Sequence, residues 1–320
     1  MKTGTGVAWR RLGLWLVGSA IGLAVAATAF TWVAPEQALH VAYRLGRRWA
    51  HLERKELPLG DLRFVYLDGG VGEPLVLVHG FGGNKDYFLA FAGYLTPHYH
   101  VIVPDMIGFG ESSRPPTADY SSLAQAERLH ALLQALGISR VHVGGTSSGG
   151  QIALTYAACY PDQTASVLAI GAPGVASAKP SPAQVEGSRG HHPLLISSTD
   201  DMVRLLTFLT ERPPWIPRPL LAGLAAERIR GRPLQEYMFK QRRPDPLEAR
   251  VAGLATPTLL VWGSSDRMVD PDAGRILKGV MPNSRLLIKS GIGHSVAIES
   301  PKELAADYLD FRSSLAEPAR

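Results

Sequence analysis

The stretch VHVGGTSSGGQIAL (residues 141–154) places two adjacent serines among four glycines, between a β-branched run and an apolar helical run. A Gly-x-Ser-x-Gly pattern between a strand and a helix is typical of a nucleophile elbow, a strained turn that lifts a serine hydroxyl above a sheet edge. Because strand and helix nearly touch there, the residues two positions before and after the nucleophile must be small. Gly145 and Gly149 meet this requirement for Ser147, whereas a nucleophilic Ser148 would have a threonine in the first of these positions. We therefore predict that Ser147 is the nucleophile.

Two further residues complete the chemistry that an activated serine needs. Asp266, in VWGSSDRMVD, follows an apolar strand, and His294, in GIGHSVAIESP, lies on a Gly-rich loop after the last strand. The order Ser, Asp, His along the chain predicts a triad in which the imidazole takes the serine proton and the carboxylate orients the imidazole. Asp270 and Asp272 are rivals to Asp266, but they lie beyond the turn and are better placed to cap the next helix.

An oxyanion hole is predicted from the segment HGFGG (residues 79–83), which follows another apolar strand. Its Phe81 N–H is expected to be one donor, and the N–H of Ser148, next to the nucleophile, the other. His79 is expected to brace this loop rather than to take part in catalysis. Asp105, in VPDMIGFGES, is expected to bond the turn after its own strand.

The elements that position these residues alternate between strand and helix from about residue 61. Continuous apolar strands between helices predict an α/β fold, with a mostly parallel sheet flanked by helices on both faces. Residues 61–174 and 251–320 are assigned to this core. Residues 175–250 are rich in Pro and Arg and show helical pieces but no strong strand. They are predicted to form an inserted helical cap over the carboxyl edge of the sheet.

The N-terminus has a different composition. Residues 12–33 carry no charge and follow Lys2, Arg10 and Arg11. About 20 apolar residues suffice to cross a bilayer, so residues 1–33 are predicted to be a single-pass anchor. The catalytic domain would then be extracytoplasmic, or periplasmic in a Gram-negative cell. The alternative is a signal peptide cleaved after the sequence ATA (residues 27–29), which would give a secreted protein. Residues 34–60 are expected to form a basic amphipathic helix and linker, lying either in the headgroup plane or on the catalytic domain.

Composition excludes several classes of function. The chain has 320 residues, of which 46% are hydrophobic and 19% charged, and this excludes a wholly disordered protein. The net charge is +5, but no dense run of Lys and Arg suggests a nucleic-acid partner. The single cysteine, Cys159, excludes an intrachain disulfide and a Cys-based zinc site. His191 and His192 lack a spaced carboxylate, so neither metal nor cofactor is expected, and no protein partner can be inferred.

Residues 61–315 resemble α/β-hydrolases of the lipase and esterase group, and more closely the membrane-anchored monoacylglycerol lipases and related bacterial lipases. The segments HGFGGNKDYF, GTSSGGQIALTYAACYP, LLISSTDDM, VWGSSDRMVD and GHSVAIESP carry the resemblance. It implies a serine carboxylester hydrolase that cleaves monoacylglycerol or similar lipid esters through an acyl-enzyme. One departure is Ser148, where these enzymes more often have Met, but only its backbone is needed for the oxyanion.

The resemblance also implies an apolar tunnel for the acyl chain, formed by the cap. The residues expected to form this tunnel are Leu205, Phe208, Leu209, Trp215, Ile216, Leu220 and Leu221. Of these, Phe208, Trp215 and Ile216 are predicted to bind the substrate.

Other functions found on this fold fit the sequence less well than a lipid esterase does. A carbon–carbon bond hydrolase of ring-cleavage products would use the same triad, but such enzymes are typically soluble and gain nothing from an anchor. A non-catalytic scaffold of this fold would lack triad members, and none is missing here. Dehalogenases and epoxide hydrolases of this fold attack with Asp, which Ser147 argues against.

Overall fold

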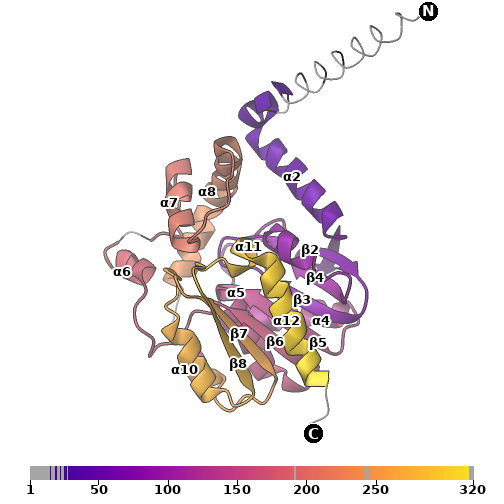
Figure 1. Cartoon of the computed structure of the whole chain (residues 1–320), viewed down its shortest axis with the longest axis vertical. Helices are drawn as coiled ribbons and strands as arrows, with labels where there is room; N and C mark the ends of the chain where they lie inside the picture. Colours follow the sequence, from indigo (N-terminus) through magenta and orange to yellow (C-terminus); the bar gives the residue numbers. More distant parts are fainter. Residues whose placement is uncertain are drawn as a thin grey trace, which may run out of the picture.

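The computed structural model describes residues 28–190, 192–241 and 245–316, together with residues 15, 19, 22, 25 and 26. Within this part of the chain, eight strands form one sheet in the order β1-β2-β4-β3-β5-β6-β7-β8 (Figure 1). The strands β1 and β2 pair antiparallel with each other, as do β2 and β4, and all later pairings are parallel. The strands are β1 (Glu53–Leu59), β2 (Leu62–Gly70), β3 (Glu73–Val78), β4 (Tyr99–Pro104), β5 (Val141–Thr146), β6 (Thr164–Ile170), β7 (Thr258–Gly263) and β8 (Ser284–Lys289).

Helices cover both faces of the sheet because successive side chains of a strand point to opposite faces. In β3, Leu75 and Leu77 are buried in one hydrophobic cluster, and Val76 and Val78 in the other. The helices are α2 (Pro35–Trp49), η1 (Lys85–Phe88), α3 (Leu89–Ala92), α4 (Ser122–Ala135), α5 (Ser148–Cys159), η2 (Pro161–Gln163), α6 (Pro182–Ser188), α7 (Thr199–Leu209), α8 (Arg218–Lys240), α9 (Leu247–Arg250), α10 (Asp272–Val280), α11 (Val296–Glu299) and α12 (Pro301–Ala316). The predicted fold class, a mostly parallel sheet between helices, is confirmed.

A helical insertion separates β6 from β7, and its helices α6, α7 and α8 lie together beyond one end of the sheet (Figure 1). It has a small core of its own, which includes Ile196, Met202, Leu205 and Leu221. The helix α9 lies within the predicted cap range of 175–250 but packs differently. Leu247, its first residue, is buried in the main core, so the chain returns to the core before residue 250.

The segment predicted as helix and linker, residues 34–60, contains a strand that sequence reasoning missed. The helix α2 packs along α8, and Gly223 of α8 lies so close to Pro35 that a Cβ there would be 3.0 Å from its carbonyl oxygen. The rest of the segment is not a linker, because residues 53–59 form the edge strand β1. Its mostly exposed, charged residues give no apolar alternation, which is how edge strands commonly avoid association. Backbone pairing with β2 and the 2.5 Å Lys55–Asp68 ion pair hold it.

Among the described residues, no helix is both long and apolar enough to span a membrane. Half of residues 12–33, on which the predicted anchor depends, lie outside the described residues, so the anchor stays a prediction.

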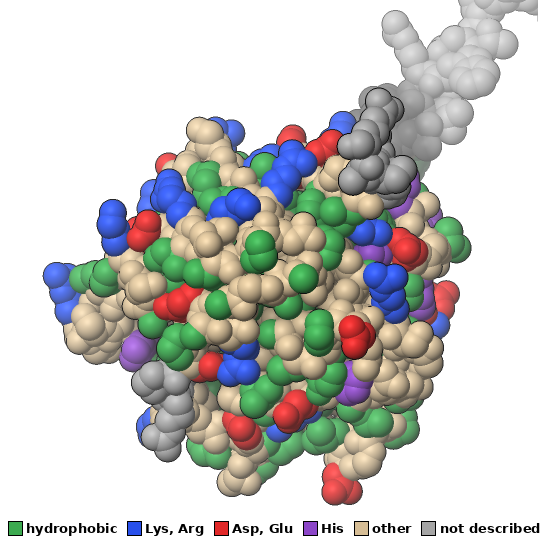
Figure 2. All heavy atoms as spheres, turned by 90° about the horizontal axis from the view of Figure 1, so that it is seen from below, with side chains coloured by type: hydrophobic (Ala, Val, Ile, Leu, Met, Phe, Trp, Pro, Cys, Tyr) green, Lys and Arg blue, Asp and Glu red, His purple; other side chains and the backbone are tan. Residues whose placement is uncertain are grey.

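On the face shown in Figure 2, acidic and basic side chains are interspersed among hydrophobic ones. The structure has exposed ion pairs such as Arg285–Asp310 and Arg267–Glu211, each at 2.7 Å. Such pairs contribute about 0–1 kcal/mol each, so the fold depends on its buried core rather than on its surface charges.

Candidate active site

Ser147 lies at the sharp corner between β5 and α5. Its φ is 54° and its ψ −127°, and His51 is the only other described non-glycine residue with a positive φ. A Cβ added at Gly145 would overlap the carbonyl of Gly149, and one added at Gly149 would overlap the carbonyl of Val78. The glycines on either side of the serine are therefore required by close backbone packing, and the backbone strain is concentrated at Ser147 itself.

Asp266 and His294 form a buried pair at the ends of neighbouring segments. The Nδ1 of His294 lies 2.7 Å from Oδ2 of Asp266, and the two residues are 3% and 6% exposed. The other carboxylate oxygen, Oδ1, accepts hydrogen bonds from the N–H groups of Met268 (2.8 Å) and Val269 (2.9 Å). Because the carboxylate fixes the proton on Nδ1, the lone pair lies on Nε2. That Nε2 is buried and has no partner among the described residues.

Gly171 lies between the serine corner and the His–Asp pair. The N–H of Ser147 donates to the carbonyl of Ile170 at 2.7 Å. At the next residue, a Cβ on Gly171 would be 2.9 Å from Nδ1 of His294 and 3.3 Å from Oδ2 of Asp266. The structure thus brings the three predicted triad residues to one edge of the sheet, beyond the carboxyl ends of β5, β7 and β8.

The predicted oxyanion residues also meet there. Phe81 and Ser148 line the same cavity as Ser147, and a Cβ on Gly80 would lie 3.1 Å from the Cβ of Ser147. The loop that carries Phe81 therefore lies against the serine corner, which is where an oxyanion donor is needed.

His79 braces the oxyanion loop, as predicted. The N–H of Met106 donates to its Nε2 at 3.1 Å, which leaves the ring proton on Nδ1, and Nδ1 donates to the carbonyl of Gly80 at 2.8 Å. Burial lowers the pKa of His79, so the ring is neutral at neutral pH. Its two hydrogen bonds join the loop after β3 to the loop after β4.

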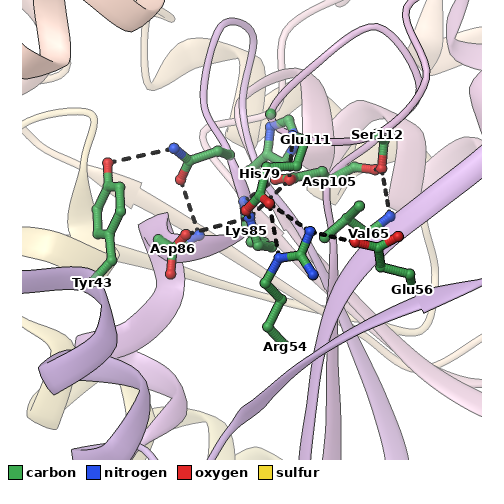
Figure 3. Close-up of polar contacts among 12 residues, drawn as sticks. Tyr43, Arg54, Glu56, Val65, His79, Lys85, Asp86, Asp105, Glu111 and Ser112 are labelled. Atoms are coloured by element: carbon green, nitrogen blue, oxygen red, sulfur yellow. Dashed lines mark hydrogen bonds and ion pairs between the residues drawn. The ribbon is translucent and has the colours of Figure 1, made fainter. Parts of the chain in front are cut away.

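Beneath this loop, Lys85 is buried among carboxylates (Figure 3). It is 2% exposed, its Nζ lies 3.0 Å from Asp105 and 2.6 Å from Glu111, and its N–H donates to Asp105 at 2.6 Å. Burial alone would lower the pKa of Lys85, but the carboxylates, above all Asp105, outweigh it and raise that pKa. Asp105 is therefore structural, as predicted from the sequence, and ties η1 to the loop after β4.

Replacing Lys85 by methionine is expected to lower the free energy of unfolding by about 3–5 kcal/mol, because Asp105 would remain buried without its cation. Urea unfolding of the full chain in detergent measures this loss. The matched control is Lys55→Met, which breaks the exposed pair with Asp68 and should cost less than about 1 kcal/mol. Equal losses from the two variants would contradict the role given to Lys85.

The cavity beside Ser147 has a volume of about 350 Å³. The predicted substrate residues are not among those that line it. Ile216 packs against the cap's own core, Phe208 is half-buried on α7, and Trp215 is 88% exposed. Helical periodicity marks an apolar face, but it does not say whether that face packs inside the cap or faces the site. The apolar lining of the cavity beside Ser147 instead includes Phe81, Val175, Leu194, Phe239, Met268 and Val269.

No cluster of three or more His, Cys, Asp or Glu side chains in the described part of the chain is arranged to hold a metal ion. His191, one of the two adjacent cap histidines, lies outside the described residues. His142 is satisfied in the core, with Nδ1 2.9 Å from Ser166 Oγ.

Comparisons with known proteins agree on one family. A family model for the alpha/beta hydrolase fold matches residues 73–193. Lipase 1 of Psychrobacter immobilis is 41% identical over 278 residues, covering 84% of this chain and 87% of that protein. Monoacylglycerol lipase abhd6-B of Xenopus laevis is 29% identical over 300 residues, covering 88% of each. The crystal structure of a membrane phospholipase A, described as a bacterial virulence factor, superposes with a TM-score of 0.86 at 34% identity, covering 96% of this chain and 100% of that one.

Proposed function

The chain belongs to the α/β-hydrolase family and is a carboxylester hydrolase, and we propose that it is a serine hydrolase of lipid esters with Ser147 as its nucleophile. The observation that carries the proposal is the buried Asp266–His294 pair, whose unpartnered Nε2 lies at the same sheet edge as the strained serine corner. A neutral imidazole held in this tautomer is the base that a serine hydroxyl needs.

The reaction follows from these positions. Nε2 of His294 takes the hydroxyl proton of Ser147 as Oγ attacks the ester carbonyl, and Asp266 stabilises the imidazolium. The N–H groups of Phe81 and Ser148 hold the oxyanion, and each such donor typically lowers the barrier by ~3 kcal/mol. The imidazolium then gives its proton to the departing alcohol, and the acyl group stays bound to Ser147 as an acyl-enzyme. Water, activated by the same imidazole, releases the fatty acid.

A lipid ester is the substrate class that the surroundings favour. The cavity beside Ser147 has an apolar wall that includes Leu194, Phe239 and Met268, which suits an acyl chain. The relatives named above are a lipase, a monoacylglycerol lipase and a membrane phospholipase A. Monoacylglycerol or a similar lipid ester is therefore the proposed substrate.

The proposal includes a membrane location, with residues 12–33 as a single-pass anchor and the catalytic domain outside the cytoplasm. Support comes from the uncharged run itself and from the solved relative, which is described as a membrane enzyme. Mass spectrometry of the N-terminal peptide from isolated membranes distinguishes the anchor from a cleaved signal, because cleavage would remove residues 1–29.

The substrate class is tested with the full chain in detergent, by following fatty-acid release from mono-, di- and triacylglycerols and product release from short-chain aryl esters. We expect turnover of monoacylglycerol, together with stoichiometric labelling of Ser147 by a fluorophosphonate. Hydrolysis confined to short aryl esters would reject the lipid substrate. Turnover of only a ring-cleavage product would instead establish the carbon–carbon hydrolase that shares this triad.

A further inference from the structure

The cap helix α8 reaches down to the oxyanion loop through the side chain of Arg228. Its Nη1 donates to the carbonyl of Gly82 at 3.1 Å, and its Nη2 donates to the carbonyl of Leu194 at 3.1 Å. The guanidinium lies directly on Gly82, where a Cβ would be 2.5 Å from its Cζ. Gly82 also has a φ of +69°, so glycine is required there both by conformation and by contact. One side chain therefore joins the oxyanion loop to Leu194, which lines the catalytic cavity.

The peptide groups beyond this contact form a chain of hydrogen bonds toward the serine. The carbonyl of Gly82 and the N–H of Gly83 belong to one peptide unit, and that N–H donates to the carbonyl of Gly80 at 3.0 Å. The carbonyl of Gly80 and the N–H of Phe81 belong to the next unit in the relay. Each peptide that accepts a hydrogen bond at its oxygen becomes a stronger donor at its nitrogen. The relay thus runs from Arg228 through two peptide groups to the proposed oxyanion donor, Phe81 N–H.

The Arg228 guanidinium differs from the exposed, paired arginines of the surface in two ways. It has no ion pair with a carboxylate among the described residues, and its Nε is buried without a partner. Burial lowers the pKa of Arg228 to about 10, which still keeps the guanidinium charged at neutral pH. A half-buried cation polarises the groups it touches more strongly than a fully exposed one does, because less water screens its charge.

The helix does not depend on Arg228 for its place over the loop. The ring of Phe239, also on α8, meets the ring of Phe81 edge to face with centroids 4.8 Å apart. Upstream, Gly223 of the same helix packs against Pro35 of α2. Removal of the guanidinium should therefore leave α8 packed, and the effect of the charge on the oxyanion loop can be measured separately.

We propose that Arg228 is a positioning residue, which orients and polarises the Gly80–Phe81 peptide so that the Phe81 N–H is ready to hold the oxyanion. His79 acts on the same peptide from the core side, through its Nδ1–H bond to the carbonyl of Gly80. Arg228 is the contribution of the cap to this arrangement. The inference rests on the proposed serine mechanism.

The test compares Arg228→Met and Arg228→Lys with the wild-type full chain in detergent. We expect the methionine variant to lose about 10- to 100-fold in kcat, somewhat less than the direct loss of an oxyanion donor, with KM changed less than threefold. Lysine keeps a cation that can donate to one carbonyl, so it should recover part of the loss. The control is Arg230→Met on the same helix, whose guanidinium pairs with Glu36 at 2.8 Å and should change kcat less than twofold.

A second measurement separates positioning of the oxyanion donor from a general structural role. An alkyl trifluoromethyl ketone forms a tetrahedral adduct with the serine and fills the oxyanion hole, so its affinity should fall in parallel with kcat/KM in Arg228→Met. Unchanged ketone affinity, or a loss carried by KM alone, would overturn the inference. If Ser147→Ala is inactive while Arg228→Met keeps its full kcat, only this inference fails. If Ser147→Ala stays active, the proposed function fails first.

Discussion

Replacement of Ser147 by alanine is expected to lower kcat for ester hydrolysis by about 10⁵- to 10⁶-fold, the loss seen when the nucleophile of a serine triad is removed. The fold should persist. The Ser147 hydroxyl has no hydrogen bond in the part of the chain that the structure describes, and alanine has the same Cβ in the strained backbone. The measurement is fatty-acid release from the substrate that the wild-type chain turns over, with thermal unfolding to show that the variant is folded.

The informative comparison is Ser148→Ala, because Ser148 carries the adjacent hydroxyl in the same glycine-rich turn. Ser148 is proposed to contribute only its backbone N–H, which alanine keeps, so this variant should retain more than about a tenth of wild-type kcat. If the two variants exchange these results, Ser148 is the nucleophile and the elbow has been assigned to the wrong residue. Fluorophosphonate labelling followed by peptide mapping identifies the modified serine independently.

The residues that sequence reasoning brought together share one property: each follows a strand. Apolar strands between helices predict a parallel sheet, and parallel strands bring their carboxyl ends to one edge. Ser147 follows β5, Phe81 comes soon after β3, and Asp266 follows β7, so their meeting depends only on the order of the elements. The glycines at the serine corner were predictable because close backbone approach leaves no room for a Cβ.

The features that the sequence did not reveal depend on tertiary packing. The strand β1 has both faces largely exposed, so it lacks the alternation by which strands are recognised. The cap helices are amphipathic, yet their apolar faces are shared between the cap's own core and the cavity wall. For this reason the predicted substrate residue Ile216 packs inside the cap, while Phe239, which lines the cavity, was not selected. The Arg228–Gly82 hydrogen bond joins residues 146 positions apart, and no local sequence pattern predicts such a contact.

Replacing Asp266 by asparagine is expected to lower kcat by about 10⁴-fold with little change in KM, because it reverses the tautomer of His294. The N–H groups of Met268 and Val269 both donate to Oδ1 of Asp266. In the variant, the amide oxygen must take that position, since the amide NH₂ cannot accept these bonds. The NH₂ group is then turned toward Nδ1 of His294, where the wild-type carboxylate accepts at 2.7 Å. To accept from that NH₂, Nδ1 must lose its proton, so Nε2 carries it and has no lone pair for the serine.

The control is Asp272→Asn, one of the rival carboxylates, which lies in the first turn of α10 and should change kcat less than about twofold. Nitrogen-15 NMR of the histidine rings adds a readout that loss of stability alone would not produce. Near neutral pH, the His294 signal should show protonation at Nδ1 in the wild type and at Nε2 in Asp266→Asn. If kcat falls while the ring keeps its proton on Nδ1, the carboxylate acts through its charge on the imidazolium rather than by fixing the tautomer. If Asp272→Asn causes the larger loss, Asp266 is not the triad acid, and the 2.7 Å contact with His294 has only a structural role.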